Sequence, residues 1–136
     1  MARNTSRPMA PHLFDGMKLH YIWGPHMTVS IMNRVTGAAL SIAGAALLVW
    51  WLIALASGPE SYAEFAGHAG SWYGQAVLIF LSWCYAFHLL AGLRHFVMDI
   101  GAGFELKTNR GWAWGVIAGS FVLTALVWLI VYGKTL

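Results

Sequence analysis

Three long stretches without a charged residue limit what this 136-residue chain can fold into. They run over Val35–Pro59, Phe65–Leu93 and Gly111–Gly133. A helix of about 20 mostly apolar residues spans the hydrocarbon core of a bilayer, and each stretch is at least that long. The sequence therefore predicts an all-α integral membrane protein. Its membrane domain, residues 28–136, is expected to hold three transmembrane helices at about 28–57, 71–100 and 112–132.

The composition agrees with a membrane protein. Hydrophobic residues make up 59% of the chain and charged residues 10%, and the mean hydropathy is +0.62. The net charge of +3 comes from basic residues scattered at the ends of the predicted helices. These residues form no basic stripe, so we expect no nucleic-acid partner. A single cysteine, Cys84, excludes an intrachain disulfide and a CxxCH haem attachment.

Lysine and arginine residues collect on one side of the predicted membrane domain. The connection around Gly58–His68 has neither, and the C-terminal tail has only Lys134. The basic residues of the N-terminal segment and of the second connection are Arg3, Arg7, Lys18, Arg34, Arg94, Lys107 and Arg110. By the positive-inside rule, this multi-pass protein has its N-terminus in the cytoplasm or matrix and its C-terminus outside.

Residues 1–27 are expected to form an irregular cytoplasmic arm, because prolines and glycines interrupt them. Pro8, Pro11, Asp15 and Lys18 also interrupt any apolar signal-peptide core. The segment is too short and irregular for an organelle transit sequence. These features favour a bacterial inner membrane, with the mitochondrial inner membrane as the alternative.

Small and capping residues mark the expected helix ends. Thr28 is a candidate N-cap of the first helix, which Gly58–Pro59 should close, and Gly101 and Gly103 should end the second. The third carries a glycine every four residues, at Gly111, Gly115 and Gly119. Such a ridge lets another helix approach closely, either from this chain or from a partner subunit.

A histidine inside the second helix is the main candidate for chemistry. His88 lies about 9 Å into the membrane from Arg94, at 1.5 Å per residue, and needs a partner there because hydrocarbon offers none. Neutral imidazole is a good iron ligand, and the small Gly92 on the same face would let a flat macrocycle approach. The alternative is a hydrogen bond to a neighbouring helix. His95, at the membrane boundary, is expected to pair with Asp99, propionates or water.

The start of the first helix carries a second candidate cluster. Ser30 and Arg34 are four residues apart and share one helix face at the membrane boundary. A hydroxyl donor and a fixed cation suit a quinone carbonyl, whose oxygen becomes more negative during reduction. The alternative is an interfacial arginine that anchors the helix end, with Ser30 as a helix-start residue. Chemistry alone favours this second interpretation.

Taken in order, these motifs resemble the cytochrome b membrane-anchor subunit of succinate dehydrogenase, over nearly the whole chain. The motifs are Arg7-Pro8, Pro11-His12, Ser30–Gly37, His88, Gly92–His95 and Asp99. The resemblance implies a four-subunit complex with a flavoprotein, an iron–sulfur subunit and a second three-helix anchor that packs against this chain. It also implies transfer of electrons from the iron–sulfur subunit to quinone, without contact to succinate.

The resemblance assigns roles to individual residues. His88 matches the axial ligand of haem b, whose opposite ligand is a histidine of the second anchor. Ser30 and Arg34 match the ubiquinone site, Arg34 also lying near the haem propionates, and His95 matches a supporting residue. Asn33 stands where the family usually has histidine, and asparagine cannot titrate near neutral pH. The arm of residues 1–27 is expected to dock on the iron–sulfur subunit.

Two acidic residues near the inner end of the second helix, Asp99 and Glu105, are candidates to relay protons to quinone. Alternatively, they balance the charges of nearby Arg94, Lys107 and Arg110. Other functions also stay open from the sequence. The chain could anchor a fumarate reductase or another quinone-linked enzyme, or it could be a membrane scaffold without redox chemistry.

Overall fold

The computed structural model describes residues 14–15, 18–19, 24–101, 103 and 105–134. A short antiparallel pair, β1 (Phe14–Asp15) and β2 (Lys18–Leu19), lies within the predicted arm. The remainder of the arm, including Arg7 and His12, lies outside the described residues. Three helical segments of the described chain are long and apolar enough to cross a membrane, Pro25–Ser57, Trp72–Asp99 and Lys107–Gly133. The prediction of three such helices is confirmed.

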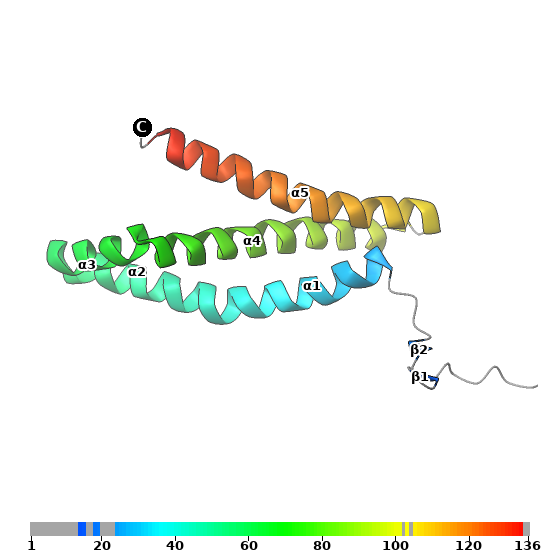
Figure 1. The fold of residues 1–136 in the computed structure, drawn as a ribbon, viewed down its shortest axis with the longest axis horizontal. Helices are drawn as coiled ribbons and strands as arrows, with labels where there is room; N and C mark the ends of the chain where they lie inside the picture. The colour runs from blue at the N-terminus through cyan, green and yellow to red at the C-terminus, as the bar shows by residue number, and fades with distance from the viewer. Residues whose placement is uncertain (1–13, 16–17, 20–23, 102, 104, 135–136) are drawn as a thin grey trace, which may run out of the picture.

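The first membrane segment consists of α1 (Pro25–Ala39), a π-helical turn η1 (Leu40–Gly44) and α2 (Ala45–Ser57). It begins at Pro25 and not near Thr28, because a proline loses nothing at the first helical position. Gly24 takes the N-cap position, and the Thr28 hydroxyl instead donates to the Gly24 carbonyl at 3.4 Å. The Thr28 cap prediction is therefore wrong. The segment bends around η1 (Figure 1), as expected where an extra residue enters the helical ladder.

The expected first connection is itself a helix, α3 (Pro59–Gly70), which the sequence reading missed. Gly58 ends α2 as predicted, with φ +109°, but Pro59 then occupies the first turn of α3. α3 packs back on α2, where the rings of Trp50 and Phe65 meet edge-on at 4.9 Å between centroids. A proline after Gly58 predicts the end of a helix, but proline also favours the first turn of a new one.

The two remaining helices are α4 (Trp72–Asp99) and α5 (Leu106–Gly133). α4 matches its predicted span, and its N-cap Ser71 accepts a hydrogen bond from the Gly74 amide at 3.2 Å. Gly101 and Gly103 follow it with φ of +85° and +79°, as their predicted role requires. α5 begins at Leu106 rather than near Trp112, because Gly111 is tolerated inside the helix.

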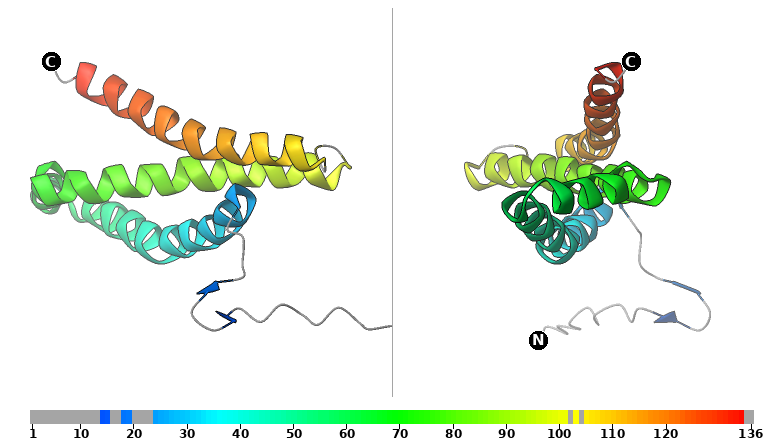
Figure 2. Two further views of the ribbon diagram at one scale, coloured as in Figure 1. Left: turned by 45° about the vertical axis from the view of Figure 1, so that its right-hand side comes forward. Right: turned by 90° about the vertical axis from the view of Figure 1, so that its left-hand side faces the viewer.

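α4 is the central helix, with the α1–α2 segment on one side and α5 on the other (Figures 1 and 2). We call the end where α1 begins, α4 ends and α5 begins the basic end, and the opposite end, with α3, the distal end. A buried cluster joins the three helices with Val29, Phe87, Ala91, Ala113 and Val116. α5 diverges from α4 toward the distal end (Figure 2).

The glycine ridge of α5 is only partly used within the chain. A Cβ atom at Gly119 would lie 3.1 Å from Leu90 Cδ1, so this position allows close packing on α4. Positions Gly111 and Gly115 face open space. Intrachain packing therefore explains Gly119 but not the other two.

Candidate functional site

The side chain of His88 projects from the middle of α4 onto α1. Its Nδ1 atom lies 3.1 Å from the backbone oxygen of Asn33. Because a carbonyl oxygen can only accept, Nδ1 carries the proton and donates it. The Nε2 atom then keeps its lone pair, which is the tautomer that a metal-binding imidazole needs. His88 can thus donate a hydrogen bond to α1 and still serve as an iron ligand.

Two glycines leave room around this imidazole. A Cβ atom at Gly37 of α1 would lie 2.9 Å from His88 Cε1, so only glycine lets the ring lie this close to α1. A Cβ atom at Gly92 would meet nothing within 4 Å. The space beside Gly92 fits the approach of a flat macrocycle to α4, and the donor set fits a haem held by one histidine of this chain.

His88, Gly92, His95 and Asp99 form one outward stripe of α4, which we call the haem face. Residues three, four and seven positions apart share a side of a helix, and the side chains of His88, His95 and Asp99 are all exposed. The expected pairing of His95 with Asp99 is absent, since neither side chain has a hydrogen bond or ion pair with any described residue. The stripe thus presents imidazole and carboxylate groups to whatever lies beside α4.

The predicted quinone residues lie on the stretch of α1 whose backbone contacts His88 at Asn33. Ser30 is half-buried and Arg34 is exposed on α1, and neither side chain bonds to a described residue. The backbone oxygen of Asn33 that accepts from His88 belongs to the peptide unit that continues into Arg34. The fold therefore brings together two clusters that lie more than fifty residues apart in sequence.

The Asn33 side chain has an unsatisfied hydrogen-bond acceptor. Its Oδ1 atom is buried without a hydrogen-bond partner in the described part of the chain. The single proton of the buried Thr36 hydroxyl is shared between the backbone oxygens of Met32, at 2.8 Å, and Asn33, at 3.2 Å. The contact to His88 uses only the main chain, so it does not depend on which side chain stands at position 33.

The sequence places Arg94 at the membrane boundary but does not predict that its side chain is buried. Only 6% of its surface is exposed, and it donates to Asn109 Oδ1 on α5. Its Nε atom has no partner among the residues that the structure describes. Asp99 and Glu105 are exposed and form no ion pair among the described residues, so they do not balance Arg94. Gly101 and Gly103 form a short turn between α4 and α5, and this turn brings Asn109 opposite Arg94. These two glycines are the sequence signal from which the contact could have been found.

Comparisons with known proteins identify the family to which the chain is similar. A family model described as the succinate dehydrogenase/fumarate reductase transmembrane subunit matches residues 3–127. The succinate dehydrogenase cytochrome b556 subunit of Paracoccus denitrificans is 37% identical over 127 residues, 93% of each chain. That of Rickettsia conorii is 37% identical over 92% of this chain and 93% of its own. The human mitochondrial cytochrome b560 subunit is 33% identical over 90% of this chain and 68% of its own.

Proposed function

The chain belongs to the succinate dehydrogenase/fumarate reductase transmembrane subunit family, and from this premise we propose that it binds haem b through His88 and forms part of a ubiquinone site. It is the cytochrome b membrane subunit of succinate dehydrogenase. The observation that carries the haem proposal is the hydrogen bond from His88 Nδ1 to the Asn33 backbone, which leaves Nε2 free.

His88 would hold the haem iron, and a histidine of the second small anchor subunit would supply the opposite ligand. The haem, when bound, accepts and returns single electrons. The Asn33 carbonyl fixes the orientation of the imidazole and increases its basicity as a ligand. The exposed haem face of α4 supports this sharing, because the His88 side chain is accessible to a neighbouring subunit.

Ser30 and Arg34 would hold the quinone. Reduction adds two electrons and two protons to the quinone, and its carbonyl oxygens become more negative as the electrons arrive. The Ser30 hydroxyl and the Arg34 guanidinium are unpaired among the described residues, so both can donate to these oxygens. Arg34 would also serve the haem propionates, as the resemblance implies, while His95 would support the site. Asp99, exposed on the haem face, is the candidate to deliver protons.

Electrons would reach the quinone from the iron–sulfur subunit, which receives them from the flavoprotein where succinate is oxidised. The basic end would therefore face the cytoplasm or matrix, with the C-terminus of α5 outside and membrane lipid around the helices. A bacterial inner membrane is the proposed location. The arm of residues 1–27 would contact the iron–sulfur subunit.

The test is the absorbance spectrum of the purified four-subunit complex. We expect the reduced low-spin b-type signal to be lost in His88→Ala and kept in His95→Ala, which removes the other histidine of the haem face. Normal haem content in His88→Ala would refute the ligation. Asp99→Asn should slow quinone turnover while haem content stays normal, and unchanged turnover would remove Asp99 from the proton path.

A further inference from the structure

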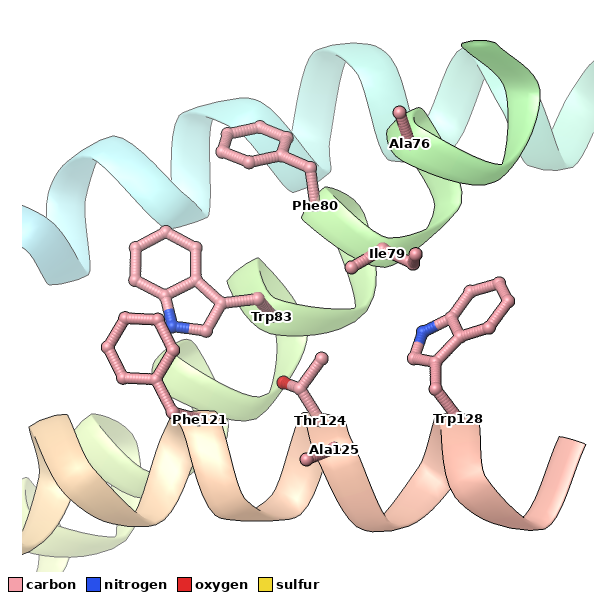
Figure 3. Close-up of a pocket in the computed structure, with 8 residues that line it drawn as sticks. All are labelled: Ala76, Ile79, Phe80, Trp83, Phe121, Thr124, Ala125 and Trp128. Carbon is pink, nitrogen blue, oxygen red and sulfur yellow. The ribbon is translucent and has the colours of Figure 1, made fainter. Parts of the chain in front are cut away.

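A second feature of the structure has no role in haem or quinone binding. A cavity of about 670 Å³ lies between α4 and α5 toward the distal end (Figure 3). Its walls are almost wholly apolar and include Ile79, Phe80, Trp83, Phe121, Ala125 and Trp128. We call it the distal pocket.

Hydrogen bonds between α4 and α5 frame the pocket at both ends. Nearer the middle of the helices, Trp83 Nε1 donates to the buried Ser120 hydroxyl at 3.2 Å, and its ring stacks on Phe121 at 5.5 Å. At the distal end the Tyr132 hydroxyl donates to Gln75 Oε1 at 2.9 Å. The two helices diverge between these bonds without collapsing on each other, so the pocket is a fixed part of the fold.

One polar group of the pocket lacks a partner. The indole Nε1 of Trp128 is buried and forms no hydrogen bond with a described residue. Its nitrogen edge is turned toward Ile79 on the opposite wall (Figure 3). An unmatched donor in a hydrocarbon environment is unfavourable. Because the chain itself encloses this atom, an acceptor from outside could satisfy it once the indole ring turns toward the pocket opening.

The pocket opens away from the haem face. At 3.6 residues per turn, Ile79 points about 180° and Trp83 about 140° around α4 from His88. The second anchor subunit must approach the haem face to supply its ligand, if the proposed function holds. The distal pocket therefore faces lipid rather than that subunit.

We propose that the distal pocket binds a glycerophospholipid from the leaflet at the distal end, with an acyl chain between α4 and α5 and an ester carbonyl accepting from Trp128 Nε1. Trp128 lies one turn before Tyr132 and close to the end of α5, the depth at which indole rings and lipid ester groups meet. From there the apolar lining continues about 10 Å down α5 to Phe121. This gives a carbonyl-bearing chain one polar contact at the interface and an apolar path below it.

Two substitutions test the two halves of this proposal. Trp128→Phe removes the donor and keeps an aromatic ring, and Ala125→Phe fills the pocket from α5. Ala118→Phe is the matched control, because Ala118 is an exposed alanine seven residues earlier on the same side of α5 and outside the pocket lining.

The complete complex is purified, stripped of lipid and titrated with palmitoyl-oleoyl phosphatidylethanolamine or its dialkyl ether analogue. Native mass spectrometry then counts the bound molecules.

We expect the unmodified complex to bind the ester lipid about threefold to tenfold more tightly than the ether lipid, the effect of one neutral hydrogen bond. Trp128→Phe should abolish this preference. Ala125→Phe should remove one bound lipid per copy of the chain, and Ala118→Phe should remove none. An unchanged preference in Trp128→Phe, equal lipid counts in the two alanine variants, or a quinone mass in place of the phospholipid would overturn the proposal.

The haem spectrum of the same samples separates this proposal from the proposed function. Haem should be normal in all three variants, because none of them touches His88. If the complex bound no haem, the ligation by His88 would fail, whereas the ester preference and its loss in Trp128→Phe would still report on the pocket alone.

Discussion

The Nδ1 atom of His88 on α4 lies 3.1 Å from the backbone oxygen of Asn33 on α1. This single contact joins the candidate haem ligand to the helix turn that carries Ser30 and Arg34. Since the acceptor belongs to the main chain, asparagine at position 33 preserves the geometry of His88. Compared with the histidine that the resemblance implies at position 33, asparagine lacks a group that titrates near neutral pH. We therefore expect this difference to bear on proton chemistry and not on the ligand.

We expect haem binding to require glycine at position 37, because a side chain there would displace the imidazole of His88. A Cβ atom there would lie 2.9 Å from His88 Cε1 and would push the ring away from the Asn33 carbonyl. We expect Gly37→Val to reduce the haem content of the purified complex severalfold, measured by the Soret absorbance per flavin. Gly67→Ala is the control, because a Cβ atom at Gly67 meets nothing within 4 Å. Full haem content in Gly37→Val would contradict the proposed packing.

Arg34→Gln should impair quinone reduction while leaving haem in place. Loss of a charge-assisted donor to a developing oxyanion typically lowers the rate about 100-fold to 1000-fold. Ser30→Ala removes a neutral donor and should have a smaller effect. The measurement is succinate-dependent reduction of a soluble quinone. Reduction of a dye that takes electrons upstream of the membrane subunits should be unchanged in both variants, and an equal fall in the two assays would place the defect elsewhere.

Much of this fold could be predicted because hydrocarbon imposes strong rules on sequence. Uncharged runs revealed the three spans, and Gly101 and Gly103 marked a turn that requires positive φ. Helix α3 was missed because Pro59 reads equally well as the end of α2 and as the start of a new helix. Local sequence cannot choose between these readings, since the packing of Phe65 on Trp50 decides it.

The candidate site was predictable only as a set of residues. His88, Ser30 and Arg34 could be selected by type and spacing, but the contact through Asn33 depends on how α1 and α4 align. The partners of Arg94 and Trp83, which are Asn109 and Ser120, likewise follow from the packing of α4 on α5. Pairing between helices is a property of tertiary structure that periodicity within one helix does not encode.

Asn109 is expected to control stability through the buried charge of Arg94. The guanidinium donates to Asn109 Oδ1, and its Nε has no partner among the described residues. Asn109→Ala would leave a buried donor without its acceptor, a change that typically costs about 1–3 kcal/mol. Asn109→Asp supplies a counter-ion at the same place and should raise the unfolding temperature. Both variants are compared by thermal unfolding of the purified complex, and destabilisation by Asn109→Asp would argue that Arg94 already has an anion from another subunit.

Gly74 is expected to be the least replaceable glycine of the distal end. The C-terminal end of α3 meets the first turn of α4 there, and a Cβ atom at position 74 would overlap the backbone oxygen of His68. Backbone cannot swing aside as a side chain can, so Gly74→Ala must separate the two helices. The same oxygen accepts from the Ser71 amide at 3.2 Å, so this link between α3 and α4 should break as well.

We expect Gly74→Ala to destabilise the complex by about 1–3 kcal/mol, the usual range for overpacking. Gly67→Ala in α3 serves as the control, since alanine in open space should stabilise a helix by about 0.5–1 kcal/mol. Thermal unfolding of the two variants should therefore shift in opposite directions. Because the junction lies at the end opposite to Arg34, haem content at low temperature should stay normal in both. Equal unfolding temperatures would show that α3 does not cross α4 at this glycine.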